Sequence, residues 1–316
     1  MRPVLYRWLL ALLFAGLAHA QSSPTPAVTT STDKSSSAPA PAKVSAPAPA
    51  KTPAPALSKV DGPLRIAIDP HNPPLIYKTG DKVSGLEADF ARGLGAALGR
   101  PVTFVETPEN NLIPALLDDK ADVIMSGFAI SQLRQVRVAF CSPYLRIGQV
   151  ALCRRSDLSS YANNANLENM RDTVGVVSGS TGDVLVGTQF GYATRKPYPA
   201  LPDAVYALLA HDVNMVITDY PTALWQSSAN EATVAVIPNL LTQDDIAWAV
   251  RKDDDDLRAA ANAYLEKLRN THALEDLVRK WIPDASSDSI APASTPPPAA
   301  ASTPAASTGE KIIRAH

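Results

Sequence analysis

The chain has few cysteines, few aromatic residues and almost no net charge, and these shortages exclude several classes of protein. Aromatic residues make up 6% of the 316 residues, which argues against a stacking platform for nucleic acid bases. The formal net charge of -2 gives no electrostatic reason to expect nucleic acid or an anionic membrane as a partner. The 5 histidines are scattered without zinc-site spacing, and no nucleophile–base motif stands out. We therefore expect no metal, no cofactor and no catalytic residue.

The two cysteines, Cys141 and Cys153, flank one strand–turn–strand segment. An even number of cysteines allows a disulfide in an oxidising compartment. Two small buried thiols would fit the sequence equally well, because spacing alone does not give the Cα separation that a disulfide needs. Both alternatives stay open at this point.

The N-terminus has the pattern of a secretory signal. Arginines precede a short apolar run over residues 8–17, and the small-x-small sequence AHA follows at 18–20. The run is shorter than the about 20 residues of a comfortable membrane span. We predict a signal peptide over residues 1–20, cleavage after Ala20 and export to the periplasm, with an uncleaved signal anchor as the alternative.

Both ends of the remaining chain are rich in proline, alanine, serine and threonine. Residues 21–60 repeat APAPAK-like units, and residues 285–316 contain STPPPAAASTPAAS. Such segments bury too little apolar surface to offset the entropy of ordering. We predict a disordered linker and a disordered tail around a folded part over about 62–284, and the tails suggest tethering, spacing or contact with the cell wall.

Short apolar runs alternate with helical patterns in the folded part, which predicts an α/β fold with mostly parallel sheets. The expected strands cover residues 64–68, 101–106, 121–127, 172–177, 213–218 and 245–252. The expected helices cover residues 86–99, 112–119, 181–189, 204–210, 221–227 and 257–282. The aspartate run at 253–256 is expected to cap the last helical region.

Several segments occur in an order that carries a family resemblance. They are GLEADFA (85–91), LIPAL (112–116), ADVIMSGFAISQLRQVRVAFCSPY (121–144), VGVVSGST (174–181), VITDYPTA (216–223), IAWAVRK (246–252) and LEDLVRKWI (274–282). Each is weak alone, but the ordered set resembles the periplasmic solute-binding proteins of the polar amino acid class, family 3 of the extracellular solute-binding proteins.

The resemblance implies a two-lobed venus-flytrap fold, the periplasmic-binding-protein fold, with two hinge crossings. Residues 61–153 and 247–284 would form lobe 1, and residues 154–246 would form lobe 2. The ligand would lie between the lobes, in agreement with the rule that open α/β sheets bind ligands beyond the carboxyl ends of their strands.

In lobe 1, the resemblance makes Arg134 the residue that holds the ligand's carboxylate. A guanidinium stays charged and matches a carboxylate with two parallel hydrogen bonds. The alternative is that Arg134 stabilises the cleft loop or pairs with a neighbour. Ser126, Gly127 and Ala129 lie in the same loop, where Gly127 permits close backbone approach and Ala129 lacks the hydroxyl often found there.

In lobe 2, the resemblance places Ser180 and Thr181 at a helix start that would bind the same carboxylate, since backbone N–H groups there favour an anion. A plain N-cap is the alternative, and both roles can hold at once. Asp219, in VITDYP, would hold the ligand's ammonium in a charge-assisted pair. Its alternative role is the N-cap of the next helix.

Asp69, Asn72 and Glu109 would line the part of the site that meets the ligand's side chain. Asn72 and Glu109 lie where relatives often place aromatic residues, so the pocket is expected to be polar. Two carboxylates there would suit a cationic or strongly hydrogen-bonding side chain. The alternative is that these loops differ and face water.

The predicted function is capture of a small zwitterion, an amino acid or a relative, by a monomeric carrier that delivers it to an inner-membrane ABC permease. Closure around the ligand is the mechanism, without covalent chemistry. One alternative is an envelope sensor or tethered binding domain without a transporter, which the tails suggest. Another is an enzyme similar to cyclohexadienyl dehydratases, in which Glu109 or Asp219 would serve as the general acid. The fold alone does not decide among them.

Overall fold

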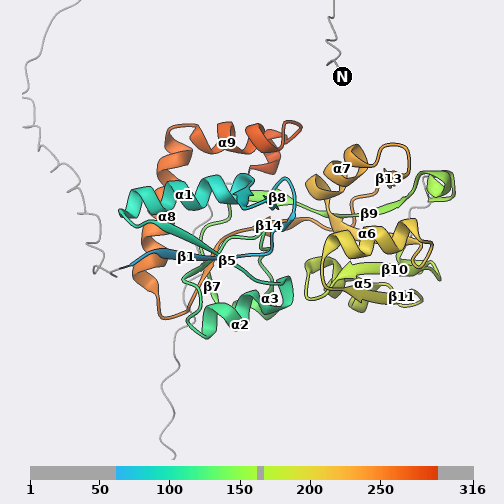
Figure 1. Ribbon diagram of the computed structural model, residues 1–316, viewed down its shortest axis with the longest axis horizontal. Coiled ribbons are helices and arrows are strands. Elements are labelled where there is room, and N and C mark those ends of the chain that lie inside the picture. The colour runs from blue at the N-terminus through green and yellow to red at the C-terminus, as the bar shows by residue number, and fades with distance from the viewer. Residues whose placement is uncertain (1–61, 162–166, 291–316) are drawn as a thin grey trace, which may run out of the picture. The chain divides into compact units, whose positions relative to one another are not determined.

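The computed structural model describes residues 62–161 and 167–290, which lie within the unit Pro53–His316 (Figure 1). The predicted signal peptide, the linker and the tail from residue 291 lie outside the described residues. Within the described ranges, no helix combines the length and the apolarity that crossing a membrane requires.

Two five-stranded sheets form the frames of the two lobes. The first has the order β5 (Val102–Glu106), β1 (Leu64–Ile68), β6 (Val123–Ile124), β15 (Ala249–Val250) and β7 (Ala139–Phe140). The second has the order β11 (Thr194–Tyr198), β10 (Thr173–Val177), β12 (Met215–Asp219), β9 (Gln149–Arg154) and β13 (Val234–Val236). In each sheet the first three strands are parallel, and the fourth is antiparallel to both neighbours. Four of the five strands in each sheet therefore run in the same direction, in agreement with the predicted mostly parallel sheets, and one strand runs against them.

Helices cover both faces of each sheet (Figure 1). In lobe 1 these are α1 (Leu86–Leu98), α8 (Asp255–Asn270) and α9 (Ala273–Trp281) on one face, with α2 (Leu112–Leu117) and α3 (Gln132–Gln135) on the other. In lobe 2 they are α4 (Leu158–Tyr161), α5 (Thr181–Gln189), α6 (Leu201–Leu209) and α7 (Tyr220–Ala229). The predicted helices are all present, and Asp254 caps α8 by accepting a hydrogen bond from Leu257 N.

Smaller elements complete the fold. A three-stranded sheet of β2 (His71–Asn72), β3 (Ile76–Thr79) and β4 (Lys82–Ser84) was not predicted from the sequence. Short 3-10 turns are η1 (Glu109–Asn111), η2 (Arg155–Asp157), η3 (Leu167–Asn169) and η4 (Ser287–Ser289).

The central strands are buried on both faces, which explains why they read as continuous apolar runs. In β1, Leu64, Ile66 and Ile68 pack with the α1, α8 and α9 side, whereas Ala67 packs with the α2 side. In β9, Val150 and Leu152 pack with α6, whereas Ala151 and Cys153 pack with α5.

The two lobes are joined by an antiparallel pair, β8 (Leu145–Ile147) with β14 (Asp244–Ile246). Arg146 binds Asp245 across it through two hydrogen bonds, at 2.7 Å and 3.2 Å. Because β9 pairs within the second sheet, the boundary predicted at residue 153 falls inside a strand of lobe 2, and the crossing precedes Gln149. The strand predicted over 245–252 is split into β14 and β15 by the return crossing.

The structure decides between the two alternatives for the cysteines. Cys141 and Cys153 are both free and buried, in the cores of different lobes. Burial raises the pKa of the Cys141 thiol to about 12 and that of Cys153 to about 11. The disulfide alternative is therefore wrong, and both residues serve as small apolar side chains.

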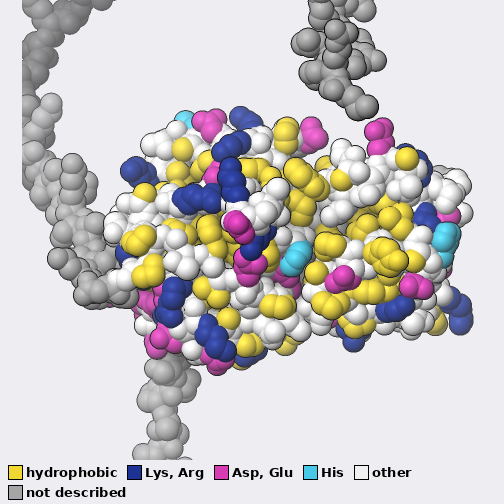
Figure 2. Space-filling model, in the orientation of Figure 1, with side chains coloured by type: hydrophobic (Ala, Val, Ile, Leu, Met, Phe, Trp, Pro, Cys, Tyr) yellow, Lys and Arg dark blue, Asp and Glu magenta, His cyan; other side chains and the backbone are white. Residues whose placement is uncertain are grey.

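Charged side chains of both signs are interspersed on the face that Figure 2 shows. This face therefore has no large single-sign patch of the kind that nucleic acid binding needs.

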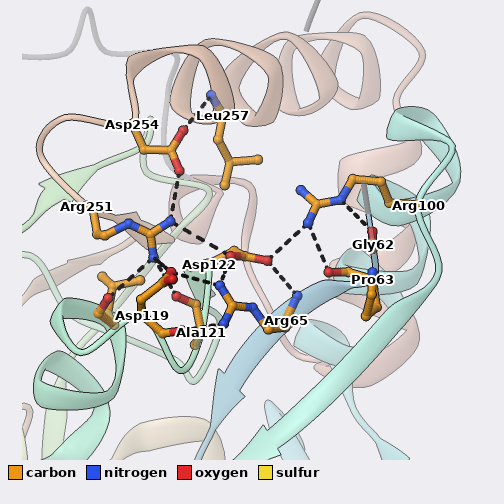
Figure 3. Close-up of polar contacts among 11 residues, drawn as sticks. Gly62, Pro63, Arg65, Arg100, Asp119, Ala121, Asp122, Arg251, Asp254 and Leu257 are labelled. Carbon is orange, nitrogen blue, oxygen red and sulfur yellow. Dashed lines mark hydrogen bonds and ion pairs between the residues drawn. The ribbon is translucent and has the colours of Figure 1, made fainter. Parts of the chain in front are cut away.

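An ion-pair cluster around Asp122 fixes the amino-terminal edge of the first sheet (Figure 3). Asp122, whose side chain is 6% exposed, accepts hydrogen bonds from Arg65 Nη2 at 2.6 Å, from Arg65 N at 2.9 Å and from Arg100 Nη2 at 3.2 Å. Arg251 Nη2 lies 3.8 Å from the same carboxylate. Burial alone would raise the pKa of Asp122, but the hydrogen bonds and charges of Arg65 and the charge of Arg100 lower it below its ordinary value.

Asp122→Ala should lower the free energy of unfolding by about 1–3 kcal/mol, because it removes a nearly buried carboxylate that partly exposed arginines share. The pKa of Asp122 is lower in the folded than in the unfolded protein. The stability that Asp122 contributes is therefore present above about pH 4 and is lost as the pH falls further. Urea denaturation measures both effects. Asp118→Ala, which removes an exposed partner of Lys120, is the matched control and should unfold as the wild type does. Equal stability of the two variants would contradict the role of the cluster.

Candidate functional site

The carboxyl ends of parallel strands from both sheets meet at one cavity. Asp69 follows β1, Ser126 follows β6 and Asp219 ends β12. The cavity has a volume of about 50 Å³, which holds only a few water molecules, so a larger ligand requires the lobes to move apart. Eight predicted site residues line it: Asp69, Asn72, Glu109, Ser126, Gly127, Ser180, Thr181 and Asp219. The sequence analysis missed His71, Gln149 and Thr218, which also line it.

Asp219 presents a half-buried carboxylate to this cavity. Gln149 Nε2 donates to its Oδ1 at 2.5 Å, and Asn72 Nδ2 donates to its Oδ2 at 3.3 Å. Burial raises the pKa of Asp219 to about 6, although these hydrogen bonds oppose the change. Asp219 occupies the N-cap position of α7, as its alternative role predicts, but its side chain makes no cap hydrogen bond there.

Residues of the two lobes contact each other across the cleft. Asn72 of lobe 1, which binds Asp219, also accepts a hydrogen bond from Thr222 Oγ1 of lobe 2 at 2.5 Å. The rings of Tyr77 and Trp225 lie 5.5 Å apart between their centroids. The lobes are therefore closed on each other in this structure.

Arg134 lies beside the cavity rather than in its lining. Its guanidinium donates to Glu109 Oε1 at 2.8 Å and to the carbonyl oxygens of Ala129 and Gly179, both at 3.1 Å. It also lies 3.8 Å from the centre of the Phe128 ring. Arg134 and Ala129 line an adjoining hollow of about 490 Å³. Glu109 lines both this hollow and the cavity. This arrangement matches the alternative expectation for Arg134, in which it pairs with a neighbouring side chain.

Glu109 is held at the start of η1 among other charged groups. Its backbone N–H donates to Asp69 Oδ2 at 3.0 Å, and the other oxygen of Asp69 lies 2.6 Å from His71 Nδ1. Burial raises the pKa of Glu109 to about 7 against the opposing charge of Arg134, while the charges of Asp69 and Asp219 raise it further. The hydrogen bond to Asp69 also raises the pKa of His71. Glu109 and Asp69 are therefore inside the site and do not face water.

The start of α5 uses its own side chains to satisfy its backbone. Ser180 Oγ accepts a hydrogen bond from Asp183 N at 3.1 Å, and Asp183 Oδ2 accepts one from Gly179 N at 2.9 Å. This pattern resembles a capping box, except that the second hydrogen bond comes from the residue before the N-cap. Arg195 also pairs with Asp183. Ser180 is therefore the N-cap of α5, as its alternative role predicts. The carboxylate of Asp183 already occupies part of this helix start.

Glu87, in α1, connects the cleft loop to both hinge crossings. Its fully buried carboxylate accepts hydrogen bonds from Gly127 N at 2.7 Å, Tyr144 Oη at 2.5 Å and Trp248 Nε1 at 3.0 Å. Tyr144 precedes β8, and Trp248 lies between β14 and β15. Burial raises the pKa of Glu87 to about 7. The sequence signal was an acidic residue on the apolar face of the helix over 86–99, which the sequence analysis did not use.

Glu87→Gln should lower the free energy of unfolding by about 1–3 kcal/mol, because the amide group turns a donor toward at least one of three donors. The folded pKa of Glu87 is raised, so the wild type loses stability as the pH rises from about 4.5 to about 7, and the glutamine variant lacks this loss. Denaturation at pH 5 and pH 8 should show the larger deficit at pH 5. A deficit that is the same at both pH values would contradict this assignment.

Comparison with known proteins identifies the family. The chain belongs to the bacterial extracellular solute-binding proteins, family 3, whose model matches residues 64–284. The predicted family and two-lobed α/β fold are thereby confirmed. Among the described residues, no group of histidine, cysteine, aspartate and glutamate is arranged to hold a metal ion.

Relatives of known function differ in what they bind or do. The histidine-binding periplasmic protein of Salmonella typhimurium is 27% identical over 69% of this chain and 86% of its own length. A putative binding component of an ABC transporter from Wolinella succinogenes, solved with lysine, is 27% identical, with a TM-score of 0.66 over 72% of this chain and 98% of that one. The cyclohexadienyl dehydratase of Pseudomonas aeruginosa is 26% identical over 56% of this chain and 66% of its own length.

Proposed function

We propose that the protein is a periplasmic solute receptor that closes on a small solute with a cationic nitrogen, an amino acid or a derivative, and delivers it to an inner-membrane ABC permease. The carrying observation is the half-buried Asp219 carboxylate, whose hydrogen-bond partners in the cleft are the neutral amides of Asn72 and Gln149. The predicted signal peptide and the relatives named for amino acid binding and ABC transport support the compartment and the role.

The geometry links ligand binding to closure. An ammonium or guanidinium group beside Asp219 would form a charge-assisted hydrogen bond, which is roughly twice as strong as a neutral one. Asn72 comes from lobe 1 and Gln149 from lobe 2, so the carboxylate that binds the cation is also bound by both lobes. A cation that binds this arrangement better than the open one shifts the population toward the closed form.

Asp219→Asn should abolish binding, because it removes the charge that faces the ligand and keeps the shape of the side chain. A thermal-shift screen with amino acids and amines measures this, since a ligand at 100 times its Kd stabilises by about 2.7 kcal/mol. Asp212→Asn, at an exposed position just before β12, is the matched control and should keep the shift. Ligands that still shift the Asp219→Asn variant would contradict the proposal.

Binding should weaken as the pH falls through about 6, because burial places the pKa of Asp219 there and only the ionised carboxylate attracts a cation. The affinity should be constant above about pH 7 and roughly tenfold weaker at pH 5. Titration calorimetry across this range checks the expectation. An affinity that stays the same from pH 8 to pH 5 would show that Asp219 does not hold the cation.

An enzyme related to cyclohexadienyl dehydratase is a second candidate, which the raised pKa of Glu109 favours. A carboxyl group with a pKa of about 7 inside a cleft suits general acid catalysis near neutral pH. The test is incubation with prephenate or arogenate, followed by measurement of the aromatic product. Turnover that is lost in Glu109→Gln would favour the enzyme, and absence of turnover would favour the receptor.

A further inference from the structure

The charged groups around the cavity pair with one another, with one exception. Arg134 pairs with Glu109 at 2.8 Å, and His71 with Asp69 at 2.6 Å. The hydrogen bonds to Asp219 come from the amides of Asn72 and Gln149, which carry no charge. The acidic residues among the described residues that line the cavity are Asp69, Glu109 and Asp219. Of these, Asp219 is the one whose carboxylate has no cationic hydrogen-bond partner. With His71 protonated, the closed cleft has one negative charge to be neutralised by a ligand.

Arg134, which the family resemblance assigns to the ligand's carboxylate, already binds an acidic side chain of the chain itself, and another acidic side chain lies at the neighbouring helix start. The Arg134 guanidinium holds Glu109, and its remaining contacts are the carbonyl oxygens of Ala129 and Gly179. At the start of α5, the backbone N–H of Gly179 holds Asp183. Arg134 and Glu109 have side chains that are only 12% and 14% exposed, so their pair is shielded from water.

An α-amino acid would have to break this pair to place its carboxylate on Arg134. Glu109 would then remain as a buried carboxylate without its partner, close to the carboxylates of Asp69 and Asp219 that already disfavour its charge. Removing one partner of a buried charge pair is costly because the other charge stays desolvated. An amine without a carboxylate leaves the pair intact and needs only Asp219.

We propose that Glu109 takes the place of the ligand's carboxylate on Arg134, so that the cleft selects small amines that lack a carboxylate over the corresponding α-amino acids. This inference rests on the proposed function and narrows its ligand class. Glu109 is then the residue that determines specificity, and Asp219 is the residue that binds the cationic nitrogen.

The test compares each amino acid with the amine that results from loss of its carboxylate. Titration calorimetry on the full-length protein would use the pairs alanine and ethylamine, histidine and histamine, lysine and cadaverine, and arginine and agmatine. We expect at least one amine to bind at least tenfold more tightly than its amino acid. The inference is overturned if, in every pair that binds, the amino acid binds as tightly as the amine or more tightly.

The variant Glu109→Gln tests the named residue. Glutamine keeps the size of the side chain but does not neutralise Arg134, so the ratio of amine affinity to amino acid affinity should fall at least tenfold. A purely structural role would weaken both members of a pair and leave the ratio unchanged. Glu106→Gln, at an exposed residue of β5 that pairs with Lys78, is the matched control and should keep the wild-type ratio.

The outcomes separate this inference from the proposed function. If amino acids bind through Asp219 and their amines do not, the receptor function stands and the selectivity inference fails. If no member of any pair binds the wild type, both fail together. If Glu109→Gln does not fold, the affinities of the wild type for amines and amino acids decide whether the selectivity inference stands.

Discussion

The ion pair between Glu109 and Arg134 determines what the cleft can bind. An arginine beside a cavity is a ready site for a carboxylate, but this arginine has its carboxylate within the chain, at 2.8 Å. The charge that remains for a ligand is that of Asp219, in a setting of neutral amides. The same scaffold that binds zwitterions in relatives is thus adapted, in our proposal, to cations. By the family resemblance, Glu109 lies where relatives often place an aromatic residue, so one acidic residue would account for the proposed change.

The fold positions these groups through its strand ends and its hinge. Each lobe points the carboxyl ends of three parallel strands toward the cavity, so short loops after the strands carry most of the site. Glu87 holds the loop at Gly127 together with Tyr144 and Trp248, which flank the hinge strands. Because these contacts share one buried carboxylate, the cleft loop and the hinge form one polar unit in the core of lobe 1. Glu87 thus ties the cleft loop to the segments that flank both hinge strands.

Much of the fold was predictable, because long apolar runs and amphipathic periodicity report burial directly. The strand at 245–252 was predicted as one element, since periodicity does not reveal that a chain leaves one sheet and enters another. The β2–β4 sheet was missed because its strands have only two to four residues. For the site, the sequence named positions after strands that line one cavity in the structure, whereas it did not reveal the partners of these residues. The pairing of Arg134 with Glu109 joins residues 25 positions apart, and only the folded structure shows that they meet.

The most direct measurement of the central claim is a double-mutant cycle on Glu109 and Arg134. The free energy of unfolding would be measured for the wild type, Glu109→Gln, Arg134→Gln and the double variant. A buried ion pair predicts a stabilising coupling of about 1–3 kcal/mol, retained when a bound amine is present. Additivity within about 0.5 kcal/mol would contradict the account, because Arg134 would then be free to take the carboxylate of a ligand.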